Sequence, residues 1–200
     1  MLSDPYKKEP PEIAQLVNKD GQLPLHTAPA FAEDFFALRQ ILDIFSFGAS
    51  HTDKQGRLPM HYFMEREGGP DCLCLNPLHS AYPDRLEHQD CLGNTPMHLT
   101  QNESLHDWAI QEKPHIRFIP NINGEFLVHL ISFRRAGVRQ LKKLLGPESR
   151  LLAQPNVDEG NTPLHNAILQ KAGCRVIKWM VERNTATLAV VNKQGLQRSI

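Results

Sequence analysis

The stretch Gly160-Asn161-Thr162-Pro163-Leu164-His165 is the clearest copy of a pattern that recurs along this 200-residue chain. Each copy begins with a glycine, and a histidine follows five residues later. A further start at Gly195 reaches Ile200, which stands where the histidine would be. The five full copies have the pairs Gly21 and His26, Gly56 and His61, Gly93 and His98, Gly124 and His129, and Gly160 and His165. Self-similarity at a nearly fixed period predicts a repeat architecture.

The spacing of the glycines divides the chain into units. Successive glycines, counting Gly195, lie 35, 37, 31, 36 and 35 residues apart. We expect repeats that start near residues 18, 53, 90, 121 and 157, with a partial sixth from residue 192. Residues 17–200 then form the repeat region, and residues 1–16 form a polar, proline-containing N-terminal segment.

Each copy predicts a turn followed by a short helix. A glycine after polar residues indicates a turn that needs positive φ. Thr95 and Thr162 can cap a helix N-terminus with their side-chain hydroxyl groups. A proline at the first helical position costs nothing, because the N–H that it lacks would have no partner there. The prolines at this position are Pro24, Pro59, Pro96 and Pro163.

Apolar residues at helical spacing predict a second helix in most units. These stretches cover residues 36–45, 105–111, 138–145 and 176–181. The last should end near Asn184, a residue type that tolerates the left-handed conformation. The second unit departs from the pattern, because glycines and prolines in residues 67–85 leave room only for a short helix at 76–82.

The repeated pattern resembles the ankyrin repeat, whose units contain a β-turn and two helices and carry a T-P-L-H-x-A signature. The resemblance covers roughly residues 17–200 and is most specific in the first, third and fifth copies. It implies an all-α ankyrin-repeat solenoid, in which β-turn loops join stacked helix-turn-helix units. In that family the signature histidines are structural, and partner proteins bind the turn tips and the first helices.

When the family's binding positions are transferred to this sequence, the resemblance implies candidate partner-binding residues at turn tips and on first helices. Leu92 and Ile122 stand out because they are apolar where tips are normally polar. They are either exposed interface anchors or side chains that tuck inward. Phe133 is a further first-helix candidate. The full set is Lys54, Gln55, Arg57, Arg66, Leu92, Asn94, Ile122, Asn123, Glu125, Arg134, Asp158 and Glu159.

The chain offers little that is typical of catalysis or metal binding. A repeated histidine after a turn is best interpreted as a hydrogen-bonding group that satisfies buried backbone within and between units. One metal-like cluster exists, but its C-x-C pair is unusual for zinc. We therefore expect no metal, no cofactor and no enzyme activity, while the cluster itself remains open. Its members are Cys72, Cys74, His79, His88 and Cys91.

Composition narrows the partner classes. Lys plus Arg and Asp plus Glu both number 22, and pairs such as Arg134-Arg135 and Lys142-Lys143 look too scattered for a basic stripe. We expect no nucleic-acid partner. No apolar stretch approaches the length of about 20 residues that a membrane helix needs. Four cysteines without framework spacing favour a cytoplasmic, intracellular setting.

The sequence thus predicts a monomeric, non-catalytic scaffold that binds a partner protein through the concave ankyrin surface. The worn repeats also resemble ankyrin proteins that intracellular bacteria deliver into host cells, so delivery of this kind is one expectation. Two alternatives stay open. The chain is a targeting module of a larger enzyme, or it is a small zinc-dependent protein that uses residues 72–91.

Overall fold

The structure is a computed structural model, and it describes residues 17–28, 46–66 and 82–195. Every regular element in this part of the chain is an α-helix or a 3-10 helix. None of these helices has the length and apolar character needed to cross a membrane. The elements are α2 (Pro24–Thr27), η2 (Ser46–Ser50), α4 (Pro59–Glu65), η3 (Pro83–Leu86), η4 (Pro96–Leu99), α6 (Glu103–Glu112), η5 (Pro114–Phe118), α7 (Leu127–Leu130), α8 (Val138–Leu145), η6 (Ser149–Ala153), α9 (Pro163–Leu169), α10 (Cys174–Arg183) and η7 (Thr185–Leu188).

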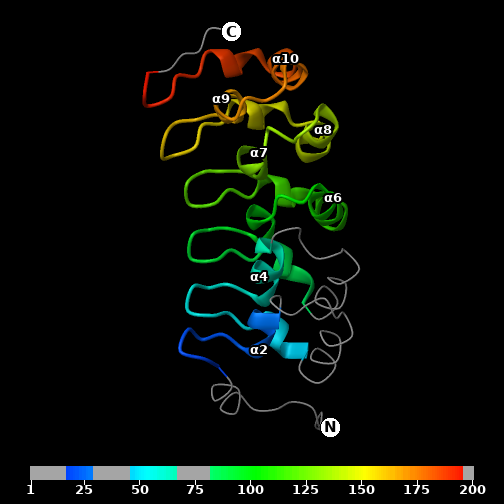
Figure 1. Ribbon diagram of the computed structural model, residues 1–200, viewed down its shortest axis with the longest axis vertical. Coiled ribbons are helices and arrows are strands. Elements are labelled where there is room, and N and C mark those ends of the chain that lie inside the picture. The colour runs from blue at the N-terminus through cyan, green and yellow to red at the C-terminus, as the bar shows by residue number, and fades with distance from the viewer. Residues whose placement is uncertain (1–16, 29–45, 67–81, 196–200) are drawn as a thin grey trace.

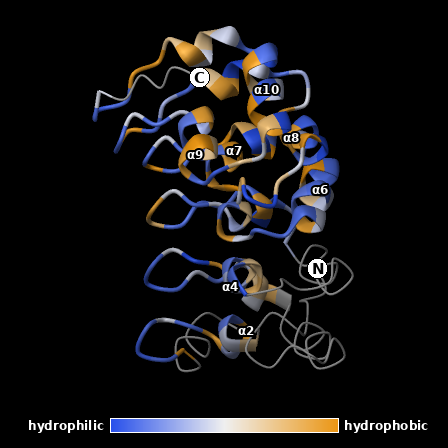
Figure 2. Ribbon diagram, turned by 45° about the horizontal axis from the view of Figure 1, so that its top comes forward, coloured by the Kyte–Doolittle hydropathy of each residue, from blue (hydrophilic) through white to orange (hydrophobic). Residues whose placement is uncertain are grey.

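The described elements form an elongated stack that runs in chain order from α2 to α10 (Figure 1). Long loops project from one side of the stack, and helices α6, α8 and α10 lie on the other side (Figure 1). Hydrophilic residues predominate along the loops, whereas hydrophobic residues gather in the helices (Figure 2). Each unit therefore buries its apolar surface against its neighbours, as expected for a repeat protein.

The projecting loops share one hydrogen-bonded conformation. Their glycines have φ between 69° and 79°, as the sequence predicted. An Asp or Asn stands three residues before most of these glycines. Its side-chain oxygen accepts hydrogen bonds from the loop backbone. Asp90 Oδ1, for example, accepts N–H bonds from Leu92 at 2.9 Å and from Asn94 at 2.8 Å. Asn18, Asp53 and Asn121 make the same pair of bonds.

A single backbone hydrogen bond links each loop tip to the next. The second residue of one loop donates its N–H to a carbonyl at the tip of the preceding loop. The first of these bonds joins Lys54 N to Asp20 O at 3.0 Å, and the last joins Lys193 N to Glu159 O at 2.8 Å. The donors between them are Cys91, Ile122 and Val157. The loops are thus fixed relative to one another as well as internally.

The first helices begin where the sequence predicted, with a proline as first residue in α2, α4, η4 and α9. Thr162 accepts a bond from the backbone N–H of His165, as a capping residue does. Thr95 makes no such bond, so the cap predicted there is wrong. Its hydroxyl lies 2.7 Å from the ring nitrogen Nδ1 of His98 and bonds the imidazole instead.

The second helices α6, α8 and α10 cover the predicted stretches 105–111, 138–145 and 176–181. They supply much of the core, for instance Leu141 and Leu144 of α8, which are buried. Asn184 follows α10 with φ −154°, so the expected left-handed end is wrong. Its side chain instead bonds the backbone of Ala186 and Ser149. The helix predicted at 36–45, and all but the last residue of the one predicted at 76–82, lie outside the described residues.

Gly93 faces a neighbouring loop at such close range that the loop contact itself can be tested. A Cβ there would lie 2.7 Å from Ile122 N, whereas one on Gly56 would lie 3.3 Å from Cys91 N. Both glycines have φ +72°, so an alanine pays the same backbone cost of about 1–2 kcal/mol at either site. We expect Gly93→Ala to lower the free energy of unfolding by about 3 kcal/mol, and Gly56→Ala by clearly less. Urea denaturation followed by circular dichroism measures both. Equal losses would contradict the close loop packing.

Candidate functional site

The signature histidines lie at the base of the loops, where each ring nitrogen meets a backbone group. In all five copies, Nδ1 accepts the backbone N–H of the residue three positions earlier, over 3.0 to 3.2 Å. A nitrogen that accepts a hydrogen bond from an N–H carries no proton. The imidazole is therefore neutral, with its proton on Nε2. The donor residues are Leu23, Leu58, Thr95, Phe126 and Thr162.

The other ring nitrogen reaches the next unit. His61 Nε2 donates to Asn94 O at 3.0 Å, and His98 Nε2 donates to Glu125 O at 3.1 Å. His26 and His129 donate in the same way to Arg57 O and Gln154 O. Each of these four rings therefore bridges two units through backbone groups. Such a ring has no lone pair left for a metal ion.

A second set of histidines, whose bridging role sequence reasoning missed, binds in the opposite direction. His51 Nε2 donates to Gly21 O at 3.1 Å, and His88 Nε2 donates to Gly56 O at 3.0 Å. Each ring also meets a signature imidazole edge-on, with centroids 5.9 Å apart for His26 and His51. Their position in the sequence could have identified this role. Each of them stands two residues before the aspartate that begins a loop.

Burial lowers the pKa of several signature histidines below the ordinary value. Desolvation outweighs the backbone hydrogen bonds and nearby carboxylates, which act in the opposite sense. The pKa of His61 falls to about 4, and those of His26, His98 and His129 are also lowered. These rings stay neutral at physiological pH, as their hydrogen bonds require.

Three candidate binding residues stand directly after a loop glycine and use their side chains to join neighbouring loops. Arg57 Nη1 lies 2.8 Å from Glu65 Oε2 in an ion pair, and Arg57 Nε lies 3.5 Å from Asp90 Oδ2. Asn121 Nδ2 donates both to Asn94 Oδ1 at 3.1 Å and to Glu125 Oε2 at 3.0 Å. Arg57, Asn94 and Glu125 are half-buried in these contacts. Their part in partner binding stays a prediction.

Apolar side chains at the tips of three consecutive loops point into solvent. Leu92 is 50% exposed and Ile122 is 62% exposed, so neither tucks inward. Val157, which the sequence analysis did not single out, is 60% exposed. It occupies the same loop position as Ile122, directly after the asparagine that begins the loop. We call Cys91, Leu92, Ile122 and Val157 the loop-tip apolar strip.

The loop backbone brings the members of this strip together. A Cβ on Gly93 would lie 3.1 Å from Ile122 Cγ2, and a Cβ on Gly124 would lie 3.2 Å from Val157 Cγ2. Each of these side chains therefore covers the glycine of the preceding loop. The strip runs along the tips of three consecutive loops, and lysines hold the equivalent position at Lys54 and Lys193 on either side.

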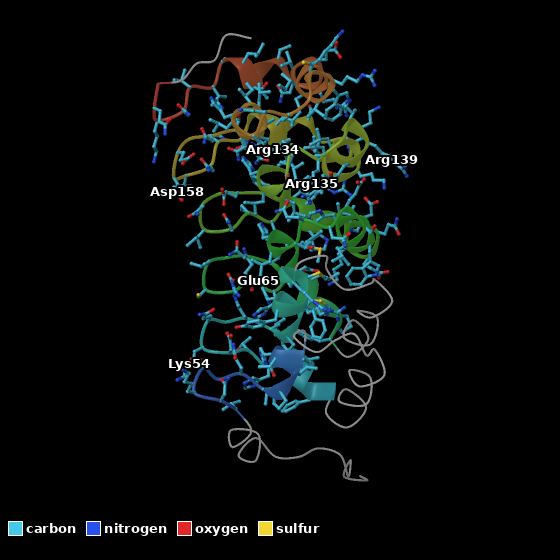
Figure 3. All side chains as sticks on the ribbon, viewed as in Figure 1. Lys54, Glu65, Arg134, Arg135, Arg139 and Asp158 are labelled. Atoms are coloured by element: carbon cyan, nitrogen blue, oxygen red, sulfur yellow. The ribbon has the colours of Figure 1, made fainter. Side chains whose placement is uncertain are left out.

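The remaining candidate residues lie mostly on the surface around the loops. Asn123 is half-buried. Figure 3 shows Lys54 and Asp158 at loop tips on one side of the stack. Phe133 is fully buried, so its place among the exposed first-helix candidates is wrong. The exposed candidates besides the strip are Lys54, Gln55, Arg66, Arg134, Asp158 and Glu159.

The cysteine and histidine cluster lies only partly within the described residues. Cys72, Cys74 and His79 fall outside them. Among residues 17–28, 46–66 and 82–195, no group of His, Cys, Asp or Glu could hold a metal ion. His88 donates its Nε2 proton to a backbone carbonyl, and Cys91 is exposed. The zinc hypothesis therefore stays untested.

Comparison with known proteins adds no family assignment, because no protein-family model and no curated protein matches this chain.

The buried histidines predict a loss of stability in mild acid. The unfolded chain binds protons near pH 6.5, whereas the folded chain resists them until lower pH. The contribution of these histidines is therefore fully present above about pH 6.5 and is lost as the pH falls toward 4. His61 alone should account for about 3 kcal/mol of that loss. Urea denaturation between pH 7.5 and 4.5 measures the slope.

Two variants separate this effect from general acid destabilisation. His61→Gln removes a buried imidazole and should flatten the pH dependence. His115→Gln removes an exposed imidazole that lies 3.2 Å from Glu87 Oε1 and should not flatten the pH dependence. A wild-type stability that is constant from pH 7.5 to 4.5, or equal flattening in both variants, would contradict the hydrogen-bonded histidine bridges.

Metal analysis tests the cysteine cluster. We expect the purified chain to contain far less than one zinc ion per molecule, because C-x-C spacing suits zinc poorly. The double variant Cys72→Ser/Cys74→Ser should then match the wild type in metal content and in melting temperature. One zinc ion per chain that the double variant loses would favour the zinc-dependent alternative.

Proposed function

We propose that this chain is an ankyrin-repeat protein that binds a partner protein and performs no catalysis. The proposal is supported by the period of the glycine–histidine pattern and by short helices that follow each loop. It is further supported by the stack of equivalent loops on one side of the molecule (Figure 1). In the resembling family, loops and first helices form a concave surface on which partner proteins dock.

The observation that carries the proposal is the loop-tip apolar strip. Loop tips in contact with water are normally polar, and exposed apolar residues on three consecutive tips favour an interaction site. Ile122 and Val157 keep 60% or more of their surface exposed after folding. They gain on binding, because apolar area removed from water contributes about 25 cal/mol per Å².

The fixed conformation of the loops makes such binding economical. Association costs free energy wherever flexible side chains and loops must be ordered. Here the loop backbone is already held by Asp or Asn side chains, by the histidines and by the bonds between tips. The strip is therefore presented in advance, with the polar residues Lys54 and Asp158 at neighbouring loop tips (Figure 3).

The setting of this interaction is also part of the proposal. Four cysteines that do not form a framework of disulfide spacing favour a reducing compartment inside a cell. The likeness to ankyrin proteins that bacteria deliver into host cells supports a host protein as partner. Residues 67–81, which lie outside the described part of the chain, hold most of the cluster on which the alternative functions depend.

Charged residues in the strip should abolish partner binding. The triple variant Leu92→Asp/Ile122→Asp/Val157→Asp places carboxylates in the apolar contact and should recover no specific partner from cell lysate. The wild-type chain should recover the same proteins reproducibly. Quantitative mass spectrometry of the captured proteins compares the two. Because all three side chains are exposed, the variant should keep its helix content by circular dichroism.

A matched control uses exposed apolar residues elsewhere. Leu169 and Val191 are each 50% exposed and lie outside the strip. The variant Leu169→Asp/Val191→Asp should recover the same partners as the wild type. The same proteins recovered by the triple variant would rule out the strip as the binding surface.

A further inference from the structure

The balanced net charge hides a strong separation of charge along the chain. Residues 126–200 contain 12 Lys or Arg and 4 Asp or Glu, a net charge of +8, and residues 1–125 carry −8. The sequence analysis judged the basic pairs of this region too scattered to form a stripe. The fold changes that conclusion, because residues about 36 positions apart meet in neighbouring units.

The fourth and fifth units stack in register over their second helices. Gly137 precedes α8 and Gly173 precedes α10, and the two glycines are 36 residues apart. Helices α8 and α10 contact each other directly. Two bonds also join their ends, from Arg134 Nε to Gln170 O at 3.2 Å and from Asn184 Nδ2 to Ser149 O at 2.9 Å. Equivalent positions in the two units therefore lie side by side.

Basic residues occupy three such pairs of equivalent positions. Arg135 pairs with Lys171, Arg139 with Arg175, and Lys142 with Lys178, and all six are exposed. Arg139 and Lys142 lie at i, i+3 on one side of α8, and Arg175 and Lys178 do so on α10, whereas Arg135 and Lys171 lie in the turns three residues before these helices. Figure 3 shows Arg139 on the side of the stack away from the loop tips. We call these six residues the paired cationic rows.

The rows have little compensating negative charge. Among the described residues, Lys178 is the one member of the rows that forms an ion pair, and its Nζ lies 3.8 Å from Glu182 Oε1. The first turns of α8 and α10 contain no acidic residue. Arg139 and Arg175 both lie in these first turns, where a positive charge is unfavourable against the helix dipole. The arrangement therefore costs stability, a feature expected where a surface is kept for a ligand.

We propose that the paired cationic rows bind an acidic helical segment of a partner protein, with carboxylates spaced i, i+4, i+7. Adjacent helix axes lie about 8–10 Å apart, so a third helix can rest between the rows and meet cations on both flanks. This binding site is separate from the loop-tip apolar strip and does not depend on the function proposed for it.

The surroundings of the rows favour a protein segment over single-stranded nucleic acid or an inserted membrane contact. Single-stranded nucleic acid binds where exposed aromatic rings stack on its bases, but Trp179 is half-buried against the core. Membrane binding by an amphipathic surface needs several apolar side chains that enter the lipid. Near the rows, Leu169 is the exposed large apolar residue in the α9–α10 connection.

A synthetic peptide tests the proposal directly. The probe is a 21-residue helical peptide with glutamates at i, i+4, i+7 on one face, and the control peptide has glutamine at those positions. We expect the full chain to bind the acidic peptide in fluorescence anisotropy, with an affinity that falls as NaCl is added. The variant Arg139→Glu/Arg175→Glu should weaken binding at least tenfold. Both changes are at exposed positions, and circular dichroism checks the fold.

A second variant controls for net charge. Arg150→Glu/Lys193→Glu changes the charge by the same amount at exposed positions outside the rows and should bind the peptide like the wild type. Equal binding by the wild type and Arg139→Glu/Arg175→Glu would overturn the proposal. So would an absence of peptide binding. Binding of a 20-base-pair DNA duplex or of phosphatidylserine vesicles, without binding of the peptide, would assign the rows to those partners instead.

Discussion

The neutral histidine that bridges two units is the interaction on which the described structure depends. One ring nitrogen accepts a backbone N–H within its own unit, and the other donates to a backbone carbonyl of the next unit. A charged imidazole could keep the second bond but would lose the first, because its Nδ1 would carry a proton and could no longer accept. The stack therefore links loop conformation, unit register and protonation state in one contact.

The side chains at the loop tips can vary in chemistry because other residues hold the loop backbone. The backbone of each loop is held by groups near its base, namely the aspartate or asparagine, the glycine and the histidine. The residue after the first loop position supplies its N–H to the ladder between tips, and where it is Lys54 or Lys193 its Nζ also donates to a carbonyl of the preceding loop. Its side chain is free to be Lys54, Cys91, Ile122, Val157 or Lys193 without disturbing the stack. Function can therefore reside at these positions while the fold stays the same.

The repeated turn, the positive φ of its glycines and the prolines at helix starts could be predicted from the sequence. Each depends on local backbone chemistry that a few neighbouring residues specify. The errors arose where a competing local bond or a distant contact decided the outcome. Thr95 bonds the imidazole of His98 instead of the helix end, and the side chain of Asn184 reaches Ser149 in another unit. Phe133 is buried because the stack covers it.

The candidate surfaces were predictable to different degrees. Leu92 and Ile122 could be identified as apolar tip residues, but their exposure could be decided only by the packing of the loops. Val157 was missed because its loop is one residue longer than the others, which obscures the register. The paired cationic rows could be recognised only from the structure. The spacing of their residues along the chain becomes meaningful once α8 and α10 are known to lie side by side.

The protonation state of the signature imidazoles tests the central claim most directly. A multiple-bond nitrogen–proton NMR spectrum of the histidine side chains identifies the proton-bearing nitrogen of each ring. At pH 7 we expect His26, His61, His98 and His129 to be neutral, each with a single tautomer and a slowly exchanging proton on Nε2. Averaged tautomers, or rings that titrate near the ordinary pKa of 6.5, would contradict the bridging role.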